Sequence, residues 1–471
     1  MMSLPIEEHR LLAGLVSAKN KAEQIRKPVL ASMSLPWTDF DMVGLFGANY
    51  QSFQPATLWR PPHSDMQSVS FSSAYEITIE SHDWAQINRL WQQLISEAEI
   101  QGDHKPKAFS GFCFDPKAKK ASHWLAFPAA CLTLPKFSFE TRKQQTQLVI
   151  NSLVDHDSDC HQLTQELVNQ VSQLCSGVHA FEQKQLQLAD ASELENSGQD
   201  QAKWQQKVAQ TVAHIGHGEV KKIVLSRADT LPFSVCPASL LSTLNQRFKE
   251  SYLFAFVRNN QCFLGATPER LIALQDRKIQ TVALAGSTPR GVSTERDDLL
   301  GAQLLSSSKD RYEHDLVVQQ LVSLLQPHCK QISAQPQPSL HKLPQIQHLI
   351  TPISGQVQNA TSIIDLLAVL HPSAAVSGLP RPQALQYIRE HEALDRGWFA
   401  APIGWLDSDF NGEFAVALRS ALVTPSDITL FAGCGLVSGS VPEHEYQESC
   451  IKMNAIRDSI RSISFVPSVT E

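Results

Sequence analysis

The sequence predicts one large α+β fold, because short apolar runs joined by brief polar breaks are interrupted by stretches of helical periodicity. Four such runs follow one another between residues 252 and 283. Strands joined by short turns are antiparallel, since a parallel pair needs a long crossover connection. Antiparallel strands interrupted by helices favour an α+β architecture over a doubly wound parallel sheet. The chain of 471 residues is long enough for roughly three domains, but a large sheet can unite such a length.

The first part of the chain gives diffuse signals. Strands are predicted at residues 69–79 and 123–134, and a helix near residues 84–95. The most polar stretch, residues 189–207, is either a linker or a surface loop that leads into a helix. Apolar residues at helical spacing, followed by two glycines as a stop, favour the loop and helix. These residues are Trp204, Val208, Val212, Ile215, Gly216 and Gly218.

We therefore treat residues 1–195 as the N-terminal part of the fold and residues 196–465 as the part that carries the candidate chemistry. The strands predicted there cover residues 222–226, 252–257, 262–266, 271–275, 279–283, 398–407, 413–423 and 428–437. The predicted helices cover residues 237–248, 309–326 and 443–462.

Composition excludes several classes of protein. With 42% apolar and 18% charged residues the chain is a folded protein, and its net charge of −7 offers no electrostatic footprint for nucleic acid. No run approaches the roughly 18 apolar residues that cross a bilayer. The acidic start lacks the apolar core of a secretory signal. The nine cysteines never form a CxxC pair, which argues against a disulfide framework or a zinc site. We expect a soluble cytoplasmic enzyme.

The last predicted helix carries two carboxylates and an ammonium on one face. Glu445, Glu448 and Lys452 stand at i, i+3 and i+7, and residues at this spacing are neighbours on a helix. A solvated helix face is the plain interpretation. The preceding segment FAGCGLV, residues 431–437, adds an apolar strand with glycines, where backbone N–H groups can approach an anion closely.

Glu313 lies in a second charged cluster, KDRYEH at residues 309–314. Acidic residues near the start of a helix are favoured by the helix dipole alone. Magnesium is typically held by one or two carboxylates together with substrate oxygens and water. Glu313 and Glu448 could therefore supply a magnesium site, if the fold brings them together.

The predicted strand at residues 413–419 alternates between two faces. Glu413, Ala415, Ala417 and Arg419 share one face. Charges separated by small residues are what the floor of an anion pocket would present. An ion pair on the surface of the sheet is the alternative.

Two further residues are candidates for proton transfer. Glu269 follows a proline-fixed turn in GATPER, residues 265–270, and such strand ends often carry catalytic groups. Lys222 opens an apolar strand. An exposed turn glutamate and a surface lysine are the more common outcomes.

Taken together and in this order, the motifs resemble those of the chorismate-utilising enzymes, the family of anthranilate synthase component I. The similarity covers roughly residues 200–460, with a weaker echo in GFCFDP at residues 111–116. The matching segments are KIVLSR at 222–227, GATPER at 265–270, LAGS at 284–287, KDRYEH at 309–314, HPSAAVSG at 371–378, Arg419, and the GCGLV, EYQES and Lys452 positions between 433 and 452.

The resemblance implies a single α+β domain of two orthogonally packed antiparallel sheets flanked by helices. It also implies a Mg²⁺ cofactor and chorismate as the small-molecule substrate. Glu313 and Glu448 would be magnesium ligands, and Glu445 would contact the metal through water. The substrate-binding residues it implies are Ala285, Gly286, Ser287, His371, Arg419, Gly433, Gly435 and Lys452.

Within the family, the residue at position 222 indicates the nucleophile. Ammonia-using anthranilate synthases carry Gln there and water-using members carry Lys; aminodeoxychorismate synthases often carry a nucleophilic Lys at position 285, where this chain has Ala285. The pattern implies water attack at C2 of chorismate, with Lys222 as base and Glu269 protonating the departing C4 hydroxyl. A free lysine has a pKa of about 10.4, so Lys222 must be partly desolvated or stripped of anionic partners. No glutaminase subunit is expected.

The resemblance favours isochorismate synthase, most similar to the menaquinone-pathway members through residues 373–376 and 395–398. Isochorismate synthase of a siderophore pathway and salicylate synthase are alternatives, although salicylate synthases tend to have Phe for His371 and Thr for Ala375. A non-catalytic chorismate-binding protein is the alternative from another class. The chain departs from the usual family residues at Tyr446, Ser449 and residues 399–401, which puts fine substrate positioning in doubt.

Overall fold

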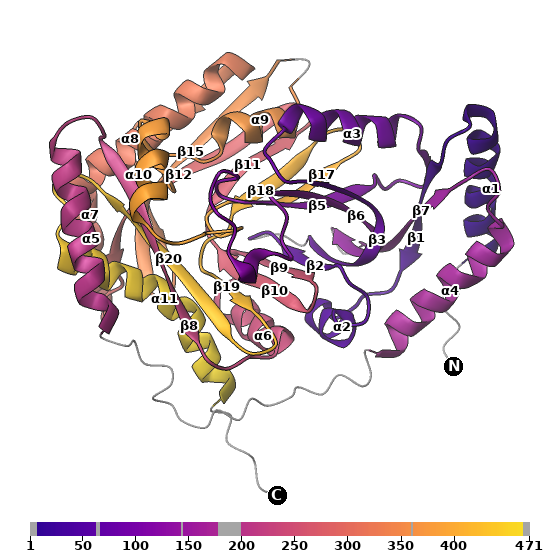
Figure 1. Cartoon of the computed structure of the whole chain (residues 1–471), viewed down its shortest axis with the longest axis horizontal. Helices are drawn as coiled ribbons and strands as arrows, with labels where there is room; N and C mark the ends of the chain where they lie inside the picture. Colours follow the sequence, from indigo (N-terminus) through magenta and orange to yellow (C-terminus); the bar gives the residue numbers. More distant parts are fainter. Residues whose placement is uncertain (1–6, 63–65, 143–144, 178–198, 359–360, 465–471) are drawn as a thin grey trace, which may run out of the picture.

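The computed structural model describes residues 7–62, 66–142, 145–177, 199–358 and 361–464. These residues form an α+β fold with a large antiparallel sheet, as the sequence predicts (Figure 1). The helices are α1 (Glu8–Ile25), α2 (Met42–Asn49), α3 (Trp84–Ser96), α4 (Cys160–Gly177), α5 (Gln199–Gly216), α6 (Pro237–Arg247), α7 (Thr294–Ser306), α8 (Ser308–Leu325), α9 (Ile363–Leu370), α10 (Arg381–His391) and α11 (Pro442–Ser464).

The strands are β1 (Val29–Trp37), β2 (Ala56–Arg60), β3 (Gln67–Ile79), β4 (Glu99–Gln101), β5 (Lys107–Phe112), β6 (Ala130–Arg142), β7 (Gln145–Val154), β8 (Lys222–Leu231), β9 (Tyr252–Arg258), β10 (Gln261–Thr267), β11 (Arg270–Gln275), β12 (Lys278–Pro289), β13 (Cys329–Ala334), β14 (Ser339–Lys342), β15 (Ile346–Val357), β16 (Gly378–Leu379), β17 (Pro402–Asp407), β18 (Gly412–Val416), β19 (Ser420–Val423) and β20 (Ile428–Leu436).

Hydrogen bonding joins the described strands into one sheet that branches at β6. One edge of β6 pairs with β3, while the other edge is shared by β5 at residues 130–133 and by β7 at residues 137–142. From β3 a first limb continues through β2, β9, β10, β19, β20, β8 and β16. From β5 a second limb continues through β17, β18, β11, β12 and β15. Among the described pairings only β1–β4 is parallel.

Two hydrophobic cores bury the faces of these limbs. The first core takes side chains from both limbs, such as Phe254 of β9 and Ile272 of β11. The second core packs β1, β7 and the first limb against α1, α2, α4, α6 and α11, and it includes Leu253 and Ala255 of β9. Successive residues of β9 thus enter different cores, as the alternation of a strand requires. The branch at β6 is what joins the two sheets implied by the sequence into one ladder.

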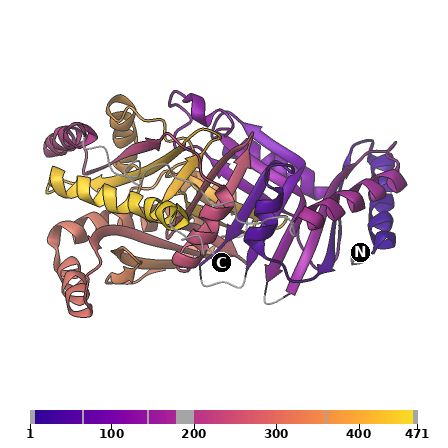
Figure 2. The ribbon, with the colours of Figure 1, turned by 90° about the horizontal axis from the view of Figure 1, so that it is seen from below.

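The two parts of the chain lie at opposite ends of the molecule. In Figures 1 and 2 the indigo to purple N-terminal part occupies one end, and α5, α7, α8, α10 and α11 lie at the other. The pairings β2–β9 and β5–β17 hold the two parts together through backbone hydrogen bonds. Among the described helices, none combines the length and apolar character that a membrane crossing requires.

Most predicted elements agree with the structure within a few residues, including α3, α6, α8, α11 and the strands β9 to β11. β8 and β12 begin where predicted, within one residue, but they continue to Leu231 and Pro289. The polar stretch at residues 189–207 leads into α5, as favoured, although residues 178–198 lie outside the described part of the chain. The prediction lacks the helices α1, α2, α4, α7, α9 and α10.

Three strand predictions are wrong in their bounds. Instead of a strand from residue 123, residues 122–124 form a 3₁₀ turn and β6 begins at Ala130. Instead of a strand from residue 398, β17 begins at Pro402, because Gly397 and Ala400 adopt positive φ angles of 50° and 60° that break an extended chain.

The single strand predicted at residues 413–423 is two strands. β18 pairs within the second limb, whereas β19 pairs with β10 and β20 in the first limb. The chain crosses between the limbs at residues 417–419, and Arg419 takes a positive φ of 47° there. The predicted common face for Glu413 and Arg419 is therefore wrong, since strand alternation does not continue through the crossing.

Candidate active site

A cavity of about 720 Å³, open mouth included, lies between the far ends of the two limbs. β8 and β20 supply one wall, β12 and β15 the opposite wall, and α8 and α11 carry charged side chains into it. Ten residues predicted from the sequence line it: Glu269, Ala285, Gly286, Ser287, Glu313, Arg419, Gly433, Gly435, Glu448 and Lys452. Motifs that span almost 200 residues of sequence thus meet around one space.

Glu313 reaches the cavity from the first turns of α8. Ser307 caps this helix by accepting a hydrogen bond from the Asp310 N–H, which fixes where the helix begins. The Glu313 carboxylate is buried and its Oε1 lies 2.9 Å from Nζ of Lys222. A Cβ atom on Gly435 would stand 2.1 Å from the same oxygen. Only glycine at position 435 leaves room for this ion pair.

Lys222 is only 1% exposed, whereas Lys221 next to it is exposed. Lys221 precedes β8, which begins at Lys222. The burial of Lys222 confirms its predicted desolvation. Its ammonium nevertheless keeps an anionic partner, Glu313.

α11 supplies the other two carboxylates from one face, as the spacing predicts. Lys452 lies 2.6 Å from Oε1 of Glu448 and donates a hydrogen bond to the Gly433 carbonyl at 2.9 Å. Glu445 pairs at 3.1 Å with Lys309, which belongs to the first turn of α8. We call Glu313, Glu445, Glu448 and their lysines the carboxylate end of the cavity.

The carboxylates of this end influence one another's pKa values. Burial and the nearby carboxylate of Glu448 raise the pKa of Glu445 to about 7, against the opposing charge of Lys309. Burial also acts to raise the pKa of Glu448, but the Lys452 ammonium outweighs it and holds that pKa below its usual value. Mutual repulsion of buried carboxylates is the situation that a bound divalent cation relieves.

The donor atoms suit a hard cation only in part. Oxygens of Glu445 and Glu448 and the Cys434 sulfur all lie within 4.8 Å of one another. The Cys434 thiol is occupied, because it donates to the Glu445 carbonyl at 3.1 Å. Carboxylate oxygens are what Mg²⁺ prefers, so Glu448, Glu445 and the adjacent Glu313 fit such an ion and Cys434 is no part of that set.

Glu269 occupies a different part of the cavity wall, between β10 and β11. Glu269 is 5% exposed. Among the described residues, no lysine or arginine lies within ion-pair distance of its carboxylate. Burial raises the pKa of Glu269 to about 7, although Lys222, Lys452 and Arg419 act to lower it. A carboxylic acid of this kind holds a proton near neutral pH and can deliver it.

Arg419 lies beside Glu269 and is held by a histidine that the sequence analysis did not single out. Its Nη2 donates to Nε2 of His348 at 3.0 Å, and Nδ1 of His348 lies 2.9 Å from Oγ of Ser287. Burial, with Arg419 and Lys452, holds the pKa of His348 well below its usual value. The imidazole is therefore neutral, with its proton on Nδ1, and serves as an acceptor for Arg419. Burial also lowers the pKa of Arg419 to about 10.

The segment at residues 285–287 enters the cavity through a bulge. The register of β12 against β15 shifts between Ala285 and Ser287, and Gly286 has a φ of 76°, which favours glycine. His314, buried behind this bulge, contacts the Ala285 carbonyl at 3.2 Å and Oγ1 of Thr351 at 2.7 Å. It ties α8, and hence Glu313, to both strands.

Three predicted residues are not on the cavity wall. Lys222 lies behind the wall, where it pairs with Glu313. Nε2 of His371 donates to the carbonyls of Cys113 and Phe114 at 3.2 and 3.1 Å, so this side chain anchors the 371–378 segment to the N-terminal part. Ala375, a few residues later, does line the cavity. Glu445 lies behind the wall and reaches the site through Glu448 and Lys309.

Glu413, considered with Arg419 as part of an anion pocket, has another role. It accepts hydrogen bonds from the Tyr252 hydroxyl at 2.5 Å and from Arg270 Nε at 3.1 Å. The alternative interpretation, an ion pair on the sheet, therefore describes Glu413, while the pocket interpretation describes Arg419.

Three polar residues of the cavity wall were not among the predicted site residues: Ser226, His348 and Arg396. Arg396 is 2% exposed and pairs with Glu392. Both charges occupy the free edge of β8, since Arg396 donates to the Val224 carbonyl and Glu392 accepts from the Ser226 N–H, each at 2.8 Å. A single histidine, serine or arginine in an apolar segment carries no local signal for such contacts.

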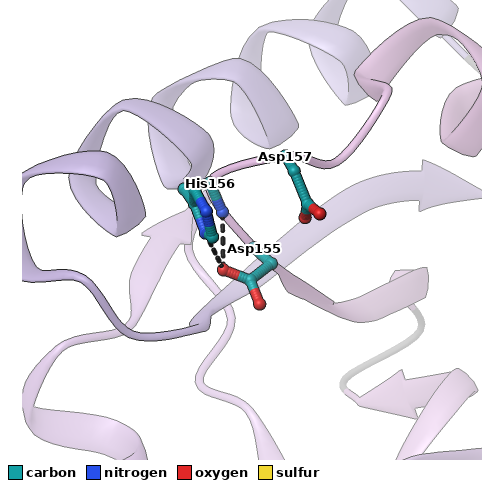
Figure 3. Close-up of side chains that lie close together, drawn as sticks. All are labelled: Asp155, His156 and Asp157. Atoms are coloured by element: carbon teal, nitrogen blue, oxygen red, sulfur yellow. Dashed lines mark hydrogen bonds and ion pairs between the residues drawn. The ribbon is translucent and has the colours of Figure 1, made fainter.

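A second group of potential metal ligands lies far from the cavity in sequence and is exposed. Asp155, His156 and Asp157 form the turn between β7 and α4 (Figure 3). The Asp155 carboxylate accepts hydrogen bonds from the backbone and Nδ1 of His156 at 2.7 and 2.6 Å. These contacts are those of a solvent-exposed turn, and they add nothing to the cavity.

Comparison with known proteins agrees with this constellation. Residues 17–461 match the family model described as "Chorismate binding enzyme". The chain is 35% identical to the "Salicylate biosynthesis isochorismate synthase" of Pseudomonas aeruginosa, covering 98% of this chain and 96% of that protein. It is 32% identical to "Isochorismate synthase MenF" of Bacillus subtilis, covering 93% and 95% respectively.

Among solved structures, the chain resembles the menaquinone-specific isochorismate synthase MenF from Escherichia coli. The two superpose with a TM-score of 0.78 at 26% sequence identity, covering 95% of this chain and all of that one. The match extends over both limbs and the N-terminal part, so it includes the cavity and the elements that frame it. The sequence, the fold and the residues around the cavity agree: this chain belongs to the chorismate binding enzyme family.

Proposed function

We propose that the protein is an isochorismate synthase, which adds water at C2 of chorismate and releases the C4 hydroxyl. The observation that carries the proposal is a pair of buried proton-transfer groups at one site. Glu269 lies on the cavity wall with a pKa that burial raises to about 7, and Lys222, 1% exposed, is ion-paired with the wall residue Glu313. The Pseudomonas aeruginosa and Bacillus subtilis relatives, which match almost the whole chain, are both named isochorismate synthases.

The proton transfers follow from where these groups lie. Lys222 accepts a proton from the water whose oxygen bonds to C2, and the ring double bonds shift as the C4–O bond breaks. Glu269 donates its proton to the departing hydroxyl, which leaves as water. A carboxyl group with a pKa near the working pH is well suited to this task, because it is both protonated and acidic enough to transfer the proton.

The charged residues of the cavity would hold the two carboxylates of chorismate. Arg419 and Lys452, with the backbone at Gly433 and Gly435, form the anion-binding part. Glu313 and Glu448 would hold a magnesium ion, with Glu445 reached through water. That ion would supply positive charge for the ring carboxylate of chorismate. Ala285 leaves no amine in the bulge of β12, which supports water over a lysine as the nucleophile.

Incubation of the purified protein with chorismate and magnesium chloride, followed by liquid chromatography and mass spectrometry, tests the proposal. We expect isochorismate and no pyruvate. Salicylate with stoichiometric pyruvate would instead establish a salicylate synthase. Saturable binding of chorismate without any product would establish the non-catalytic alternative.

For the pathway, we propose a menaquinone role, on the resemblance of residues 373–376 and 395–398 to menaquinone-pathway members. The similarity to a salicylate-biosynthesis protein favours a siderophore role as the alternative. Deletion of the gene should remove menaquinone from lipid extracts, whereas loss of a salicylate-derived or catechol siderophore would favour the alternative. All nine cysteines are free thiols, which is in keeping with the reducing cytoplasm we propose as its location.

A further inference from the structure

We propose that the hydroxyl of Ser226 binds the carboxylate of the enolpyruvyl side chain of the substrate, beside Lys452. The inference rests on the proposed function and assigns a binding role that neither the sequence motifs nor the relatives' names give to this serine. It concerns the part of the cavity farthest from Glu313 along β8.

The backbone directs Ser226 into the cavity. Lys222, Val224 and Ser226 alternate onto one face of β8, and both Val224 and Ser226 line the cavity. Ser226 pairs directly with Gly433 of β20. A Cβ atom on Gly433 would lie 2.7 Å from Oγ of Ser226, so the hydroxyl occupies the space above this glycine.

The position of Ser226 is fixed by a side-chain clamp on the edge of β8. β16 covers that edge only at Lys222 and Ile223. Beyond it, the Glu392 carboxylate accepts the Ser226 N–H and Arg396 donates to the Val224 carbonyl. The Val224 N–H also donates to the Ser377 carbonyl at 2.9 Å. These three backbone groups of the edge are thus satisfied without the serine hydroxyl.

That hydroxyl has no hydrogen-bond partner among the described residues, although Ser226 is 4% exposed. An unpaired buried hydroxyl is unfavourable. Two other polar side chains of the described wall are paired: Ser287 with His348, and Lys452 with Glu448 and the Gly433 carbonyl. An acceptor atom of a ligand bound in the cavity would give the Ser226 hydroxyl its missing hydrogen bond.

Two glycines of β20 separate this position from the carboxylate end. Gly435 faces Glu313 and Lys222, and Gly433 faces Ser226, next to the carbonyl that anchors Lys452. The two positions are two residues apart, roughly 7 Å along a strand. A substrate carboxylate held at the Glu313 position cannot also reach Ser226. The second carboxylate of chorismate, on its enolpyruvyl group, is the acceptor that remains.

Steady-state kinetics of Ser226→Ala test the inference, with Ser110→Ala as the matched control. Ser110 of β5 is 1% exposed and its hydroxyl is also unpaired, but it does not line the cavity. We expect Ser226→Ala to raise KM for chorismate on the order of 10-fold, the worth of a hydrogen bond to a charged group, and to change kcat less than about threefold. Ser110→Ala should match the parent in both constants.

Competitive inhibition by two aromatic probes locates the contact. One is a benzoate bearing the carboxyvinyl ether, and the other is the hydroxybenzoate without it. Ser226→Ala should weaken only the first probe, by a factor similar to the KM change. An unchanged KM, or equal weakening of both probes, would overturn the inference. Failure of the parent protein to convert chorismate would instead overturn the proposed function, so the two failures are distinguishable.

Discussion

The two ends of the cavity treat buried carboxylates in opposite ways. At the carboxylate end, Glu313, Glu445 and Glu448 each have a lysine ammonium within 3.1 Å. At the other end, Glu269 is also buried, but among the described residues it has no ion-pair partner, and Lys222, Lys452 and Arg419 lower its pKa only from a distance.

The comparison teaches that burial alone does not decide the role of a carboxyl group. Lys452 holds the pKa of Glu448 below its usual value, whereas burial raises the pKa of the unpaired Glu269 to about 7. The pKa of Glu445 is also raised to about 7, because the charge of Glu448 adds to burial and outweighs Lys309. Arg419 lies between the two ends, since its charge affects both Glu448 and Glu269, and His348 directs its guanidinium. The predictions below change one end at a time.

The largest effect is expected at the carboxylate end. Glu313→Ala or Glu448→Ala should abolish turnover while leaving the fold intact, because each removes an anionic ligand from the proposed magnesium site and frees a buried lysine. Isothermal titration should also show that magnesium and chorismate bind interdependently in the parent and independently or not at all in the variants. Near-normal activity of either variant in limiting magnesium would contradict the assignment.

At the Glu269 end, Glu269→Gln should lower turnover by a factor on the order of 10² to 10⁴, the usual worth of a positioned proton donor. Affinity for chorismate should stay within a few fold. Because the acid form is required, kcat/KM of the parent should fall as pH rises through about 7. That descending limb should be missing in the variant. A collapse of affinity with turnover retained would make Glu269 a binding residue instead.

The same residue should affect stability with a definite sign. The pKa of Glu269 is about 7 in the folded protein and the ordinary 4.5 in the unfolded chain, so the folded protein holds this proton more tightly. The free energy of unfolding therefore falls as pH rises from about 4.5 to 7. Glu269→Gln should therefore be more stable than the parent at pH 8, by up to about 3 kcal/mol. Urea denaturation at pH 8 and pH 5 checks this, and the difference should shrink below about 1 kcal/mol at pH 5. An equal difference at both pH values would mean that packing, not ionisation, is responsible.

A smaller effect is expected where the two ends meet. His348→Leu should raise KM for chorismate on the order of 10-fold, since Arg419 loses the acceptor that directs it. His348→Gln, which retains an acceptor, should recover part of that loss. Kinetics of the two variants distinguish a loss of Arg419 orientation from a packing defect. A packing defect would raise KM equally in both variants, whereas a loss of orientation would raise it more in His348→Leu.

How far the sequence predicts this site depends on whether a contact is local. The i, i+3, i+7 spacing on α11 correctly places Glu445, Glu448 and Lys452 on one face, because helix geometry alone decides it. The antiparallel pairing of β9 and β10 follows equally from their short connection. Arg419 was assigned to the cavity through strand alternation that its positive φ interrupts, so the residue is right and the reason is wrong.

The contacts that the sequence cannot reveal join distant segments. His348 meets Arg419 across 71 residues, and Glu392 reaches the Ser226 N–H across 166. Each depends on how the limbs fold back from β6, and no periodicity encodes that. His371 illustrates the converse, since its motif points to the cavity while its side chain anchors the N-terminal part.

The central claim is that Lys222 activates water at one end while Glu269 releases a proton at the other, and oxygen-18 labelling tests it most directly. Chorismate is incubated in H₂¹⁸O with the parent and with Lys222→Gln, and the products are analysed by mass spectrometry and carbon NMR. The account predicts label on the C2 hydroxyl of isochorismate from the parent and no labelled isochorismate from the variant. Unlabelled isochorismate from the parent, or labelled product from Lys222→Gln at the parent rate, would contradict it.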